Sequence, residues 1–560
     1  MAGSSSSSSS ILPSTAALLA AAVAGAAAGY CAASRTSTLP THRHGAPRPA
    51  TSDAPEPEAS APASDEASLS RGRLLKDVSV SDVYIWDIEH LGSRFEPAGP
   101  SSVNVMKNAP RRRSSFNLSG LDDGGPPTKV PHDQEYNRII APSECILRTI
   151  VRKPGQESST SAYVRAGPRN ALHFNPEGVN AAIVTCGGLC PGLNNVVREI
   201  TCTLCYNYGA KMVYGVVGGF RGFYEARYLP PQRLTPSKLE TVHHHGGTIL
   251  QSSRGGFDLP KILKFLEEYQ IDQLYVIGGD GTHRGAYAIH QGCMKANMNI
   301  SITGIPKTID NDIDHIDRCF GFSSAVEAAQ RAIRSAKVEA TCNLPNGIGI
   351  VKLMGRSAGY ISAFSSLGSG DVDLVLVPEV PIVLDGPKGC LPHLLRRVRE
   401  QGYAVVVVAE GAGEEILGES SETDASGNKK LPQIGEFLKE KVAQFFKANG
   451  SEATVKYIDP SYMVRSVPAN AADSQYCMQL AQNAVHGAMA GYTGFSVGLC
   501  NNRMVYLPIP KLVESSPRKM NAYGRTWERV LQVTRQPNTV PPKDGDEPDI
   551  YDECPDSKLT

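Results

Sequence analysis

"LYVIGGDGTHRG" (residues 274–285) passes from a continuous apolar run into a polar turn rich in glycine. A run that is short, apolar and not alternating is typical of a parallel strand buried on both faces. Three glycines, Gly278, Gly279 and Gly281, surround a single carboxylate, Asp280. Because ligands of open parallel sheets bind beyond the carboxyl ends of strands, the turn is a candidate binding site.

Similar runs lie on both sides of this stretch. From residue 180 onward, "AAIVT", "MVYGVV", "ITGI", "IGIVKL", "VDLVLVP" and "AVVVVAEG" alternate with helical stretches. One of these, "PGLNNVVREITCTLCYNYG", places Val196, Val197 and Ile200 on one face, and Gly209 can terminate the helix. The alternation predicts a two-lobed α/β fold with largely parallel sheets flanked by helices.

The composition is that of an ordinary soluble globular protein. Of the 560 residues, 41% are hydrophobic and 20% are charged, and Lys+Arg equals Asp+Glu at 56 each. This balance gives no support to a nucleic-acid or membrane-surface partner. The 13 cysteines have no regular spacing, which favours free thiols over a disulfide framework.

The N-terminus has a different composition. Residues 1–50 are rich in Ser and Ala and contain no Asp or Glu, which is typical of a plastid transit peptide. We therefore expect a chloroplast location, with the cytoplasm as the alternative. The uncharged, Ala-rich stretch 15–33 leaves a membrane anchor open, although Ala contributes little transfer energy.

The other segments outside the regular pattern are polar. Residues 51–75 form a predicted disordered linker, 76–175 an N-terminal extension with a flexible segment, and 531–560 a predicted disordered tail. Within the extension, a basic run precedes Ser114 and Ser115. Such a run could be a kinase target, but a solvated loop is the favoured interpretation.

Two further strand ends carry glycines and cations. "TCGGLCPGLNN" places Gly187 and Gly188 directly before a helix, whose free N–H groups and dipole favour phosphate. "GGTILQSSRGGFD" places Arg254 beside Gly255, so a guanidinium could reach a phosphate over an uncluttered backbone. Each signal is weak by itself, and a plain loop arginine is the alternative for the second.

Asp280 would repel a polyphosphate unless a cation lay between them. Mg²⁺ prefers oxygen ligands and commonly takes one or two protein carboxylates together with phosphate oxygens. Asp280 is therefore predicted to contact Mg²⁺ on a nucleotide, while Gly281 leaves room and Thr282 offers a hydroxyl. The alternative is a turn residue or helix cap.

The next strand ends in "PKTIDNDIDHID". Asp310 and Asp312 are two residues apart, so only one need point inward, and Lys307 and Thr308 precede them. A carboxylate beside a phosphate-binding lysine and hydroxyl suits a general base that takes a proton from a substrate hydroxyl.

Acids and arginines also follow the later strands. "KLMGRSAGYI" contains Arg356, "VVAEGAG" contains Glu410, and "YIDPSYMVR" contains Tyr462 and Arg465. Arginines pair with phosphate and a carboxylate accepts hydrogen bonds from hydroxyls. The set therefore indicates a sugar phosphate.

The order of "GGDGT", "PKTIDND", "MGRSAGYI", "VVAEGAG" and "KYIDPSYMVR" resembles 6-phosphofructokinase. "AAIVTCGGLCPGLNNVVREI" and "RAGPR" (165–169) are similar to its plant ATP-dependent branch, and the resemblance covers about residues 78–530. It implies transfer of the ATP γ-phosphate to the 1-hydroxyl of fructose 6-phosphate. Residues 176–315 would form the ATP-binding lobe and 316–530 mainly the sugar-phosphate lobe, although the chain could cross back between the two lobes.

The resemblance implies roles for the residues of this chain that occupy the family's motif positions. The residues implied to bind ATP are Gly188, Arg254, Gly255, Gly279, Asp280, Gly281 and Thr282. Those implied to contact the sugar phosphate are Thr308, Ile309, Asp310, Met354, Gly355, Arg356, Glu410, Tyr462, Met463, Val464 and Arg465. Asp280 would hold Mg²⁺ and Asp310 would accept the proton. The resemblance also implies a homotetramer and a response to AMP.

The phosphoryl donor is a separate question. Pyrophosphate-using relatives carry Asp where Gly281 stands, and a side chain there would crowd a nucleotide. Lys307 favours pyrophosphate as the donor, because pyrophosphate-using relatives have lysine at this position. The combination of Gly281 with Lys307 nevertheless resembles the plant ATP-dependent branch. The alternatives are pyrophosphate-dependent transfer, another kinase with a "GGDG" loop, and a non-catalytic regulatory subunit. "PNGIG" (345–349) lacks the arginine that in bacterial relatives completes a neighbour's phosphate site.

Overall fold

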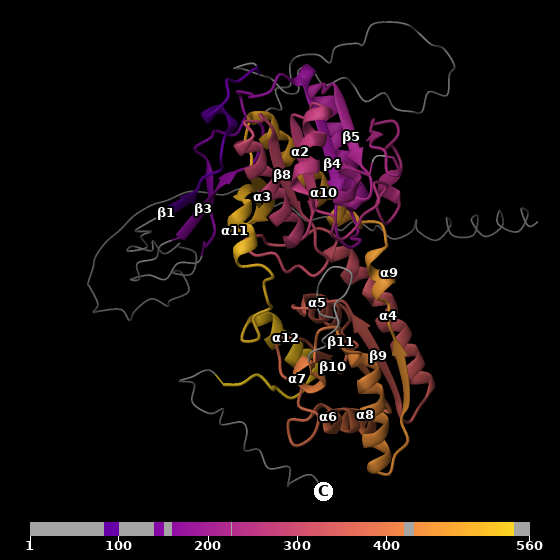
Figure 1. Cartoon of the computed structure of the whole chain (residues 1–560). Helices are drawn as coiled ribbons and strands as arrows, with labels where there is room; N and C mark the ends of the chain where they lie inside the picture. The colour runs from indigo at the N-terminus through magenta and orange to yellow at the C-terminus, as the bar shows by residue number, and fades with distance from the viewer. Residues whose placement is uncertain (1–82, 100–138, 151–159, 226, 419–430, 543–560) are drawn as a thin grey trace, which may run out of the picture. The chain divides into compact units, whose positions relative to one another are not determined.

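The computed structural model describes residues 83–99, 139–150, 160–225, 227–418 and 431–542 (Figure 1). The chain divides into the units Met1–Leu74 and Leu75–Thr560, and all described residues lie in the second unit. The predicted transit peptide, the linker and Ser114 and Ser115 lie outside the described residues. No helix within the described ranges is long and apolar enough to cross a membrane.

The first sheet has ten strands in the order β1-β3-β14-β13-β8-β7-β4-β5-β6, with β2 added beside β3. Its central strands β13, β8, β7, β4 and β5 run parallel to one another, while β14, β2 and β6 are antiparallel to their neighbours. The bounds are β1 Val83–Trp86, β2 Cys145–Leu147, β3 Thr160–Arg165, β4 Asn180–Thr185, β5 Met212–Val216, β6 Gln232–Arg233, β7 Gln273–Gly278, β8 Ser301–Pro306, β13 Phe495–Cys500 and β14 Arg503–Pro508.

The second sheet has four parallel strands in the order β10-β11-β9-β12. Its bounds are β9 Gly347–Leu353, β10 Leu374–Leu376, β11 Tyr403–Ala409 and β12 Thr454–Ile458. Ile348 and Ile350 pack in one apolar cluster with α6 and α8, whereas Val351 and Leu353 belong to the cluster that contains α4. Burial on both faces explains why these strands are continuously apolar. The predicted α/β fold with largely parallel sheets is confirmed.

The helices connect the parallel strands. Their bounds are α1 Leu193–Cys202, α2 Leu259–Glu268, α3 Asp280–Lys295, α4 Phe322–Cys342, α5 Tyr360–Ser369, α6 Cys390–Gln401, α7 Glu414–Leu417, α8 Ile434–Ala448, α9 Ser461–Arg465, α10 Ala471–Ala490, α11 Ile509–Glu514 and α12 Arg525–Thr534. After α1 the chain continues as a π-helical turn, Thr203–Tyr208, which ends at Gly209 with φ 73°. Only glycine adopts such a left-handed φ without strain, so Gly209 terminates the helix as its sequence position predicts.

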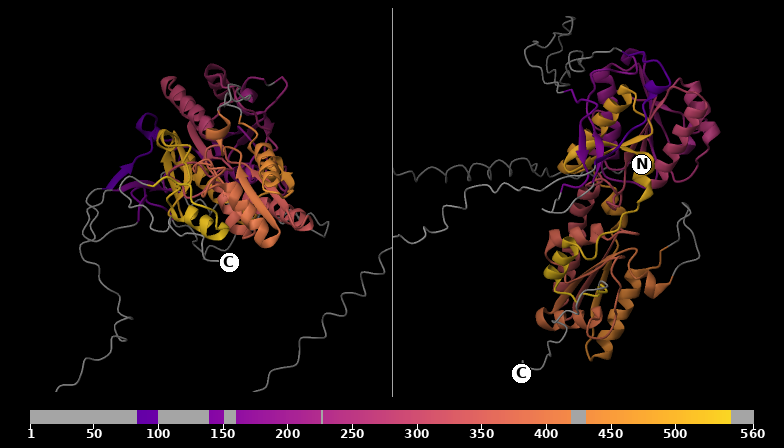
Figure 2. Two further views of the ribbon diagram at one scale, coloured as in Figure 1. Left: turned by 90° about the horizontal axis from the view of Figure 1, so that it is seen from below. Right: turned by 90° about the vertical axis from the view of Figure 1, so that its left-hand side faces the viewer.

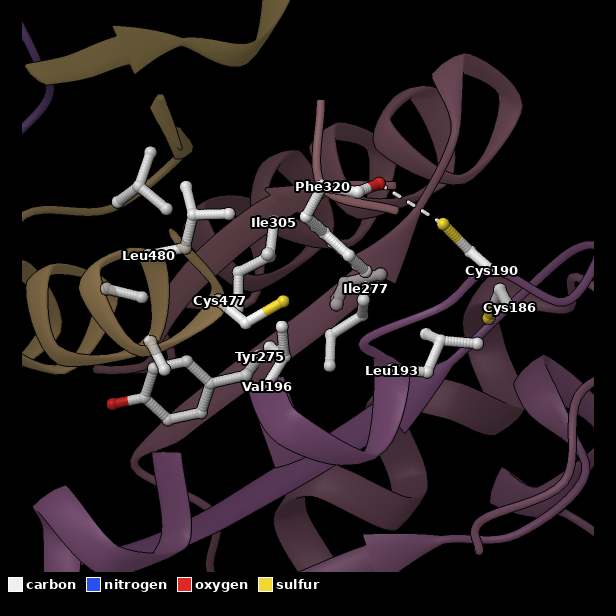
Figure 3. Close-up of a cluster of buried hydrophobic side chains, with 14 of the residues drawn as sticks. Cys186, Cys190, Leu193, Val196, Tyr275, Ile277, Ile305, Phe320, Cys477 and Leu480 are labelled. Carbon is white, nitrogen blue, oxygen red and sulfur yellow. Dashed lines mark hydrogen bonds between the residues drawn. The ribbon is translucent and has the colours of Figure 1, made fainter. Parts of the chain in front are cut away.

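A dense apolar core lies beneath the glycine-rich turn after β4 (Figure 3). Leu193 and Val196 of α1 face Tyr275 and Ile277 of β7, and Leu480 of α10 closes the cluster. Helices α1 and α10 pack against each other on the sheet, while α3 packs on β7 and β8. The turn residues Cys186 and Cys190 are buried here, and the Cys190 thiol donates to the Phe320 carbonyl oxygen, with 3.2 Å between the sulfur and oxygen. Close packing of this kind restricts the conformation of the turn after β4.

The ends of the described chain join the sheets rather than forming separate segments. β1, within the predicted extension, pairs with β3, and β3 pairs with β14, so β3 lies between the indigo strand β1 and the yellow strand β14 (Figure 2). Residues 495–508 thus return to the first sheet. Helix α12 extends to Thr534, past the predicted tail boundary at 531, and the Gln536 side chain bonds both backbone groups of Val375 in β10. The amphipathic face that buries Trp527 and Val530 explains why this part of the tail is ordered.

Candidate active site

A polar cavity of about 520 Å³ lies between the turn after β4 and the carboxyl ends of β9, β11 and β12. Segments far apart in the sequence meet here because the residues that follow strands of both sheets border the cavity. Its wall is formed by Gly187, Gly188, Leu189, Ser252, Ser253, Arg254, Lys352, Met354, Arg356, Glu410, Asp459, Ser461, Tyr462 and Arg465. Seven of these were predicted as site residues: Gly188, Arg254, Met354, Arg356, Glu410, Tyr462 and Arg465.

The turn after β4 is pinned to the segment that contains Arg254. The Gly187 N–H donates to the Ser253 carbonyl over 3.0 Å, and the Ser252 hydroxyl donates to the Gly187 carbonyl over 2.6 Å. A Cβ on Gly188 would lie 3.6 Å from Nη2 of Arg254 and 4.0 Å from Nη1 of Arg465. Two guanidinium groups therefore flank a bare backbone, which suits a phosphate.

Lys307 joins three strand ends. Its backbone N–H donates to the Gly278 carbonyl over 2.9 Å, and its ammonium donates to the Gly188 carbonyl over 2.6 Å. The side chain is buried, and burial is the main reason that the pKa of Lys307 lies below its ordinary value. The "GGDGT" and "PKTIDND" segments are thereby fixed against the turn after β4.

The carboxylate residue of the stretch 274–285 lies at the start of a helix. Asp280 is the first residue of α3, and Gly279 precedes it in an extended conformation. A Cβ on Gly281 would meet nothing within 4 Å, so this glycine faces open space. Thr282 is buried, and its side chain fills the space that a Cβ on Gly278 would need. Gly281 is thus a position where an added side chain would meet open space and would not disturb the fold.

Four carboxylates lie in this region, and each repels at least one of the others. Burial, followed by the charges of Asp312 and Glu410, raises the pKa of Asp310 to about 8. Its Oδ1 atom is buried without a hydrogen-bond partner among the described residues. Burial, followed by the charge of Asp312, also raises the pKa of Asp280. Asp312 itself accepts a 2.8 Å hydrogen bond from the Thr308 hydroxyl.

These acids fit a divalent cation brought by a polyphosphate. No group of three or more ligating side chains suited to a metal occurs within the described ranges. Mg²⁺ does not need one, because it retains water and phosphate oxygens and takes few carboxylates. Asp280 and Asp310 are buried acids with raised pKa values, and Oδ1 of Asp310 has no hydrogen-bond partner among the described residues. A bound cation would supply the positive charge that these groups lack.

At the other side of the cavity lie Arg356 and Glu410. The Glu410 N–H donates to the Leu353 carbonyl over 2.9 Å, so the β9–β11 pairing places this carboxylate. Burial raises the pKa of Glu410, against the opposing charges of Lys352 and Arg356. The Arg465 guanidinium lies 4.7 Å from the ring centroid of Tyr462.

Twelve predicted site residues do not line the cavity: Gly255, Gly279, Asp280, Gly281, Thr282, Lys307, Thr308, Ile309, Asp310, Gly355, Met463 and Val464. The side chains of Ile309 and Val464 are buried in the core, so a ligand could reach only their backbone. Met463 is exposed. Gly255 (φ 70°) and Gly355 (φ 135°) shape the backbone next to Arg254 and Arg356, and a Cβ on Gly355 would lie 2.5 Å from the Ala358 carbonyl oxygen. Asp310 is within electrostatic reach of Glu410 and Arg356, which do line the cavity.

Seven residues that line the cavity were not predicted as site residues: Gly187, Leu189, Ser252, Ser253, Lys352, Asp459 and Ser461. The Lys352 ammonium lies 2.7 Å from Oδ2 of Asp459. A signal was present, since Lys352 is the one charged residue in the apolar run "GIGIVKL". A lysine inside a strand buried on both faces needs a partner or a polar cavity.

The fold and the site together define a two-lobed α/β protein with a polar cavity lined by arginines, a lysine and carboxylates. A family model, Phosphofructokinase, matches residues 180–488. ATP-dependent 6-phosphofructokinase 7 of Arabidopsis thaliana is 47% identical over 403 residues, covering 71% of this chain and 82% of the relative. ATP-dependent 6-phosphofructokinase 5, chloroplastic, of the same plant is 43% identical over 458 residues, covering 79% and 84%.

A solved structure shows the same fold. The pyrophosphate-dependent phosphofructokinase from Marinobacter aquaeolei matches with a TM-score of 0.52 at 20% identity, covering 66% of this chain and 95% of that chain. This chain belongs to the phosphofructokinase family, and the expected plant-type relationship is confirmed.

Proposed function

We propose that this protein is an ATP-dependent 6-phosphofructokinase, which transfers the ATP γ-phosphate to the 1-hydroxyl of fructose 6-phosphate and forms fructose 1,6-bisphosphate. The observation that carries the proposal is the position of Asp310. Its buried carboxyl lies in the electrostatic field of Lys307, which holds the turn after β4, and of Arg356 and Glu410 across the cavity. A base placed between two anion-binding regions suits transfer from a nucleotide to a sugar phosphate.

The donor side is assigned to the glycine-rich segments. Gly188, Arg254 and Gly279–Thr282 bind the nucleotide phosphates through backbone N–H groups and the guanidinium. Gly281 faces open space, which supports ATP over pyrophosphate because an Asp there would project toward the nucleotide. Asp280 would hold Mg²⁺, which when bound neutralises charge on the transferred phosphate.

The acceptor side is assigned to the second sheet. Arg356 and Arg465 bind the sugar phosphate, and Glu410 accepts hydrogen bonds from sugar hydroxyls. Asp310 accepts the proton of the 1-hydroxyl as that oxygen attacks the phosphorus atom. A pKa near 8 suits this role, because a general base works best with a pKa close to the operating pH.

Compartment, assembly and regulation belong to the same proposal. The composition of residues 1–50 and the chloroplastic relative at 43% identity support a plastid enzyme. The family resemblance supports a homotetramer that responds to AMP. A fluorescent fusion of residues 1–75 should enter chloroplasts, and a cytoplasmic signal would refute the plastid assignment.

The activity has a direct test. Purified protein is mixed with Mg²⁺, fructose 6-phosphate and either ATP or pyrophosphate, and fructose 1,6-bisphosphate is measured. Fructose 1,6-bisphosphate should form with ATP as the donor and should not form with pyrophosphate. Turnover with pyrophosphate alone would overturn the donor assignment. No turnover with either donor, despite binding of both substrates, would instead support a regulatory subunit.

A further inference from the structure

Lys352 occupies an unusual place at the carboxyl end of β9. Ile348 and Ile350, on the same face of the strand, are fully buried in the apolar cluster with α6 and α8. Lys352 is the next residue on that face, only 13% of its side chain is exposed, and it reaches the cavity wall. Burying an ammonium group is costly unless the site uses or pairs the charge.

The ammonium is held by a carboxylate that is itself fixed. Oδ2 of Asp459 lies 2.7 Å from Nζ of Lys352. Oδ1 of Asp459 accepts from the Ser461 hydroxyl over 2.5 Å and from the Ser461 N–H over 3.1 Å. Burial, the largest single cause, lowers the pKa of Lys352, but the bond to Asp459 and the charges of Tyr457, Asp459 and Glu410 together outweigh burial, so the pKa is raised. Lys352 therefore keeps its charge at one place in the cavity wall.

Glu410 is the group on which this charge acts. Four charged groups face its buried carboxyl: Lys352 on β9, Arg356 after β9, Asp459 after β12 and Asp310 after β8. Asp459 opposes ionisation of Glu410, and the two cations favour it, with Lys352 making the larger contribution. When Arg356 pairs with a sugar phosphate, its charge is shared with that dianion, and Lys352 becomes the main remaining counter-charge of Glu410.

We propose that Lys352, anchored by Asp459, is a positioning residue for the acceptor sugar, which keeps Glu410 ionised as a hydrogen-bond acceptor for sugar hydroxyls while Arg356 serves the phosphate. This inference rests on the proposed function and adds a residue pair to its acceptor site. The two cations at the end of β9 then have different roles, because Arg356 contacts the ligand and Lys352 acts through Glu410.

The test compares Lys352→Met with Lys352→Arg. Lys337→Met is a matched control, because Lys337, which lies on α4 and outside the cavity wall, forms a 2.6 Å ion pair with Asp371. Fructose 6-phosphate binding is measured by calorimetry, and KM for both substrates by steady-state kinetics, between pH 6.5 and 9. Lys352→Met should weaken sugar-phosphate binding about 10- to 100-fold, the scale of a hydrogen bond to a charged group, and leave the ATP KM within about twofold.

The pH profile separates the proposed role from lost packing. Without Lys352, Glu410 ionises at higher pH, so fructose 6-phosphate binding by Lys352→Met should improve as pH rises, more steeply than in the wild type. Lys352→Arg retains the charge and should bind almost normally. The inference is overturned if Lys352→Met binds normally, if its defect is the same at every pH, or if Lys352→Arg is equally impaired. Wild-type protein that fails to bind fructose 6-phosphate would overturn the proposed function itself.

Discussion

The ammonium group of Lys307 donates a 2.6 Å hydrogen bond to the carbonyl oxygen of Gly188. Lys307 follows β8 and Gly188 follows β4, and these strands are not neighbours, because β7 lies between them. The bond therefore crosses the end of β7, where α3 starts at Asp280. It fixes the turn after β4 at the strand ends and places a buried positive charge under the predicted donor site.

Replacing Lys307 by Met should impair use of the donor. The change removes the bond to Gly188 and the buried charge, so we expect the ATP KM to rise and kcat to fall, each about tenfold. Steady-state kinetics measures both. Lys261→Met is the control, because Lys261 makes a 2.8 Å ion pair with Asp258 at the exposed start of α2. Normal kinetics for Lys307→Met would contradict a role at the donor site.

Asp310→Asn should abolish most of the chemistry and retain binding. The amide keeps the shape of the side chain but cannot accept a proton, so kcat should fall about 10²- to 10⁴-fold with KM values nearly unchanged. Asp371→Asn, at an exposed pair with Lys337, should retain full activity. If Asp310→Asn kept near wild-type kcat, another group would be the base.

The pKa of Asp310 also predicts the pH dependence. With a folded-state pKa of about 8, the carboxyl is mostly protonated near neutrality, so kcat/KM should rise with pH and level off above about 8. The contribution of Asp310 to the free energy of unfolding should change in the opposite direction and fall as pH rises. The folded state binds this proton more tightly than the unfolded state, so the contribution is lost as pH rises from the ordinary value of 3.8 through about 8.

Thermal unfolding checks this second effect. Asp310→Asn has no such proton, so its Tm advantage over the wild type should grow between about pH 4 and pH 8 and then stay constant. A constant difference over that range would show that Asp310 does not titrate as inferred.

Gly281→Asp should block ATP without unfolding the protein. Nothing lies within 4 Å of a Cβ at Gly281, and its φ lies outside the left-handed region, so the side chain fits but carries a negative charge toward the nucleotide. We expect ATP-dependent kcat/KM to fall at least about 100-fold, with an unchanged Tm. Gly178→Asp is the matched control, since a Cβ there also meets nothing within 4 Å. Undiminished ATP use by Gly281→Asp would remove Gly281 as a donor determinant.

Asp280→Asn should raise the Mg²⁺ requirement. Loss of the carboxylate removes a hard oxygen ligand with full charge, so the Mg²⁺ concentration for half-maximal rate should rise about tenfold or more. Titration of Mg²⁺ at saturating ATP and fructose 6-phosphate measures it, and chelation with EDTA should stop the wild-type reaction. An unchanged Mg²⁺ titration would place the cation elsewhere.

Much of the fold was predictable because buried parallel strands have a local signature. The apolar runs around Ile183, Val276 and Val407 are the cores of β4, β7 and β11, and glycines follow each of them. The tail boundary was less predictable. Trp527 and Val530 form an apolar face, but α12 is stabilised by packing on α5 and β10, which no local pattern shows.

The sequence by itself determined the functional groups at each strand end: the carboxylate Asp280 among glycines, the carboxylate Asp310 beside Lys307, and Arg356 in its own motif. These are local features, because each depends on neighbours a few residues away. Only the tertiary structure decided which strand ends meet. Lys307 is joined to Gly188 across 119 positions, and the Lys352–Asp459 pair joins β9 to the residue after β12. Strand order and register, which bring such side chains together, follow from packing of the whole sheet and not from any one motif.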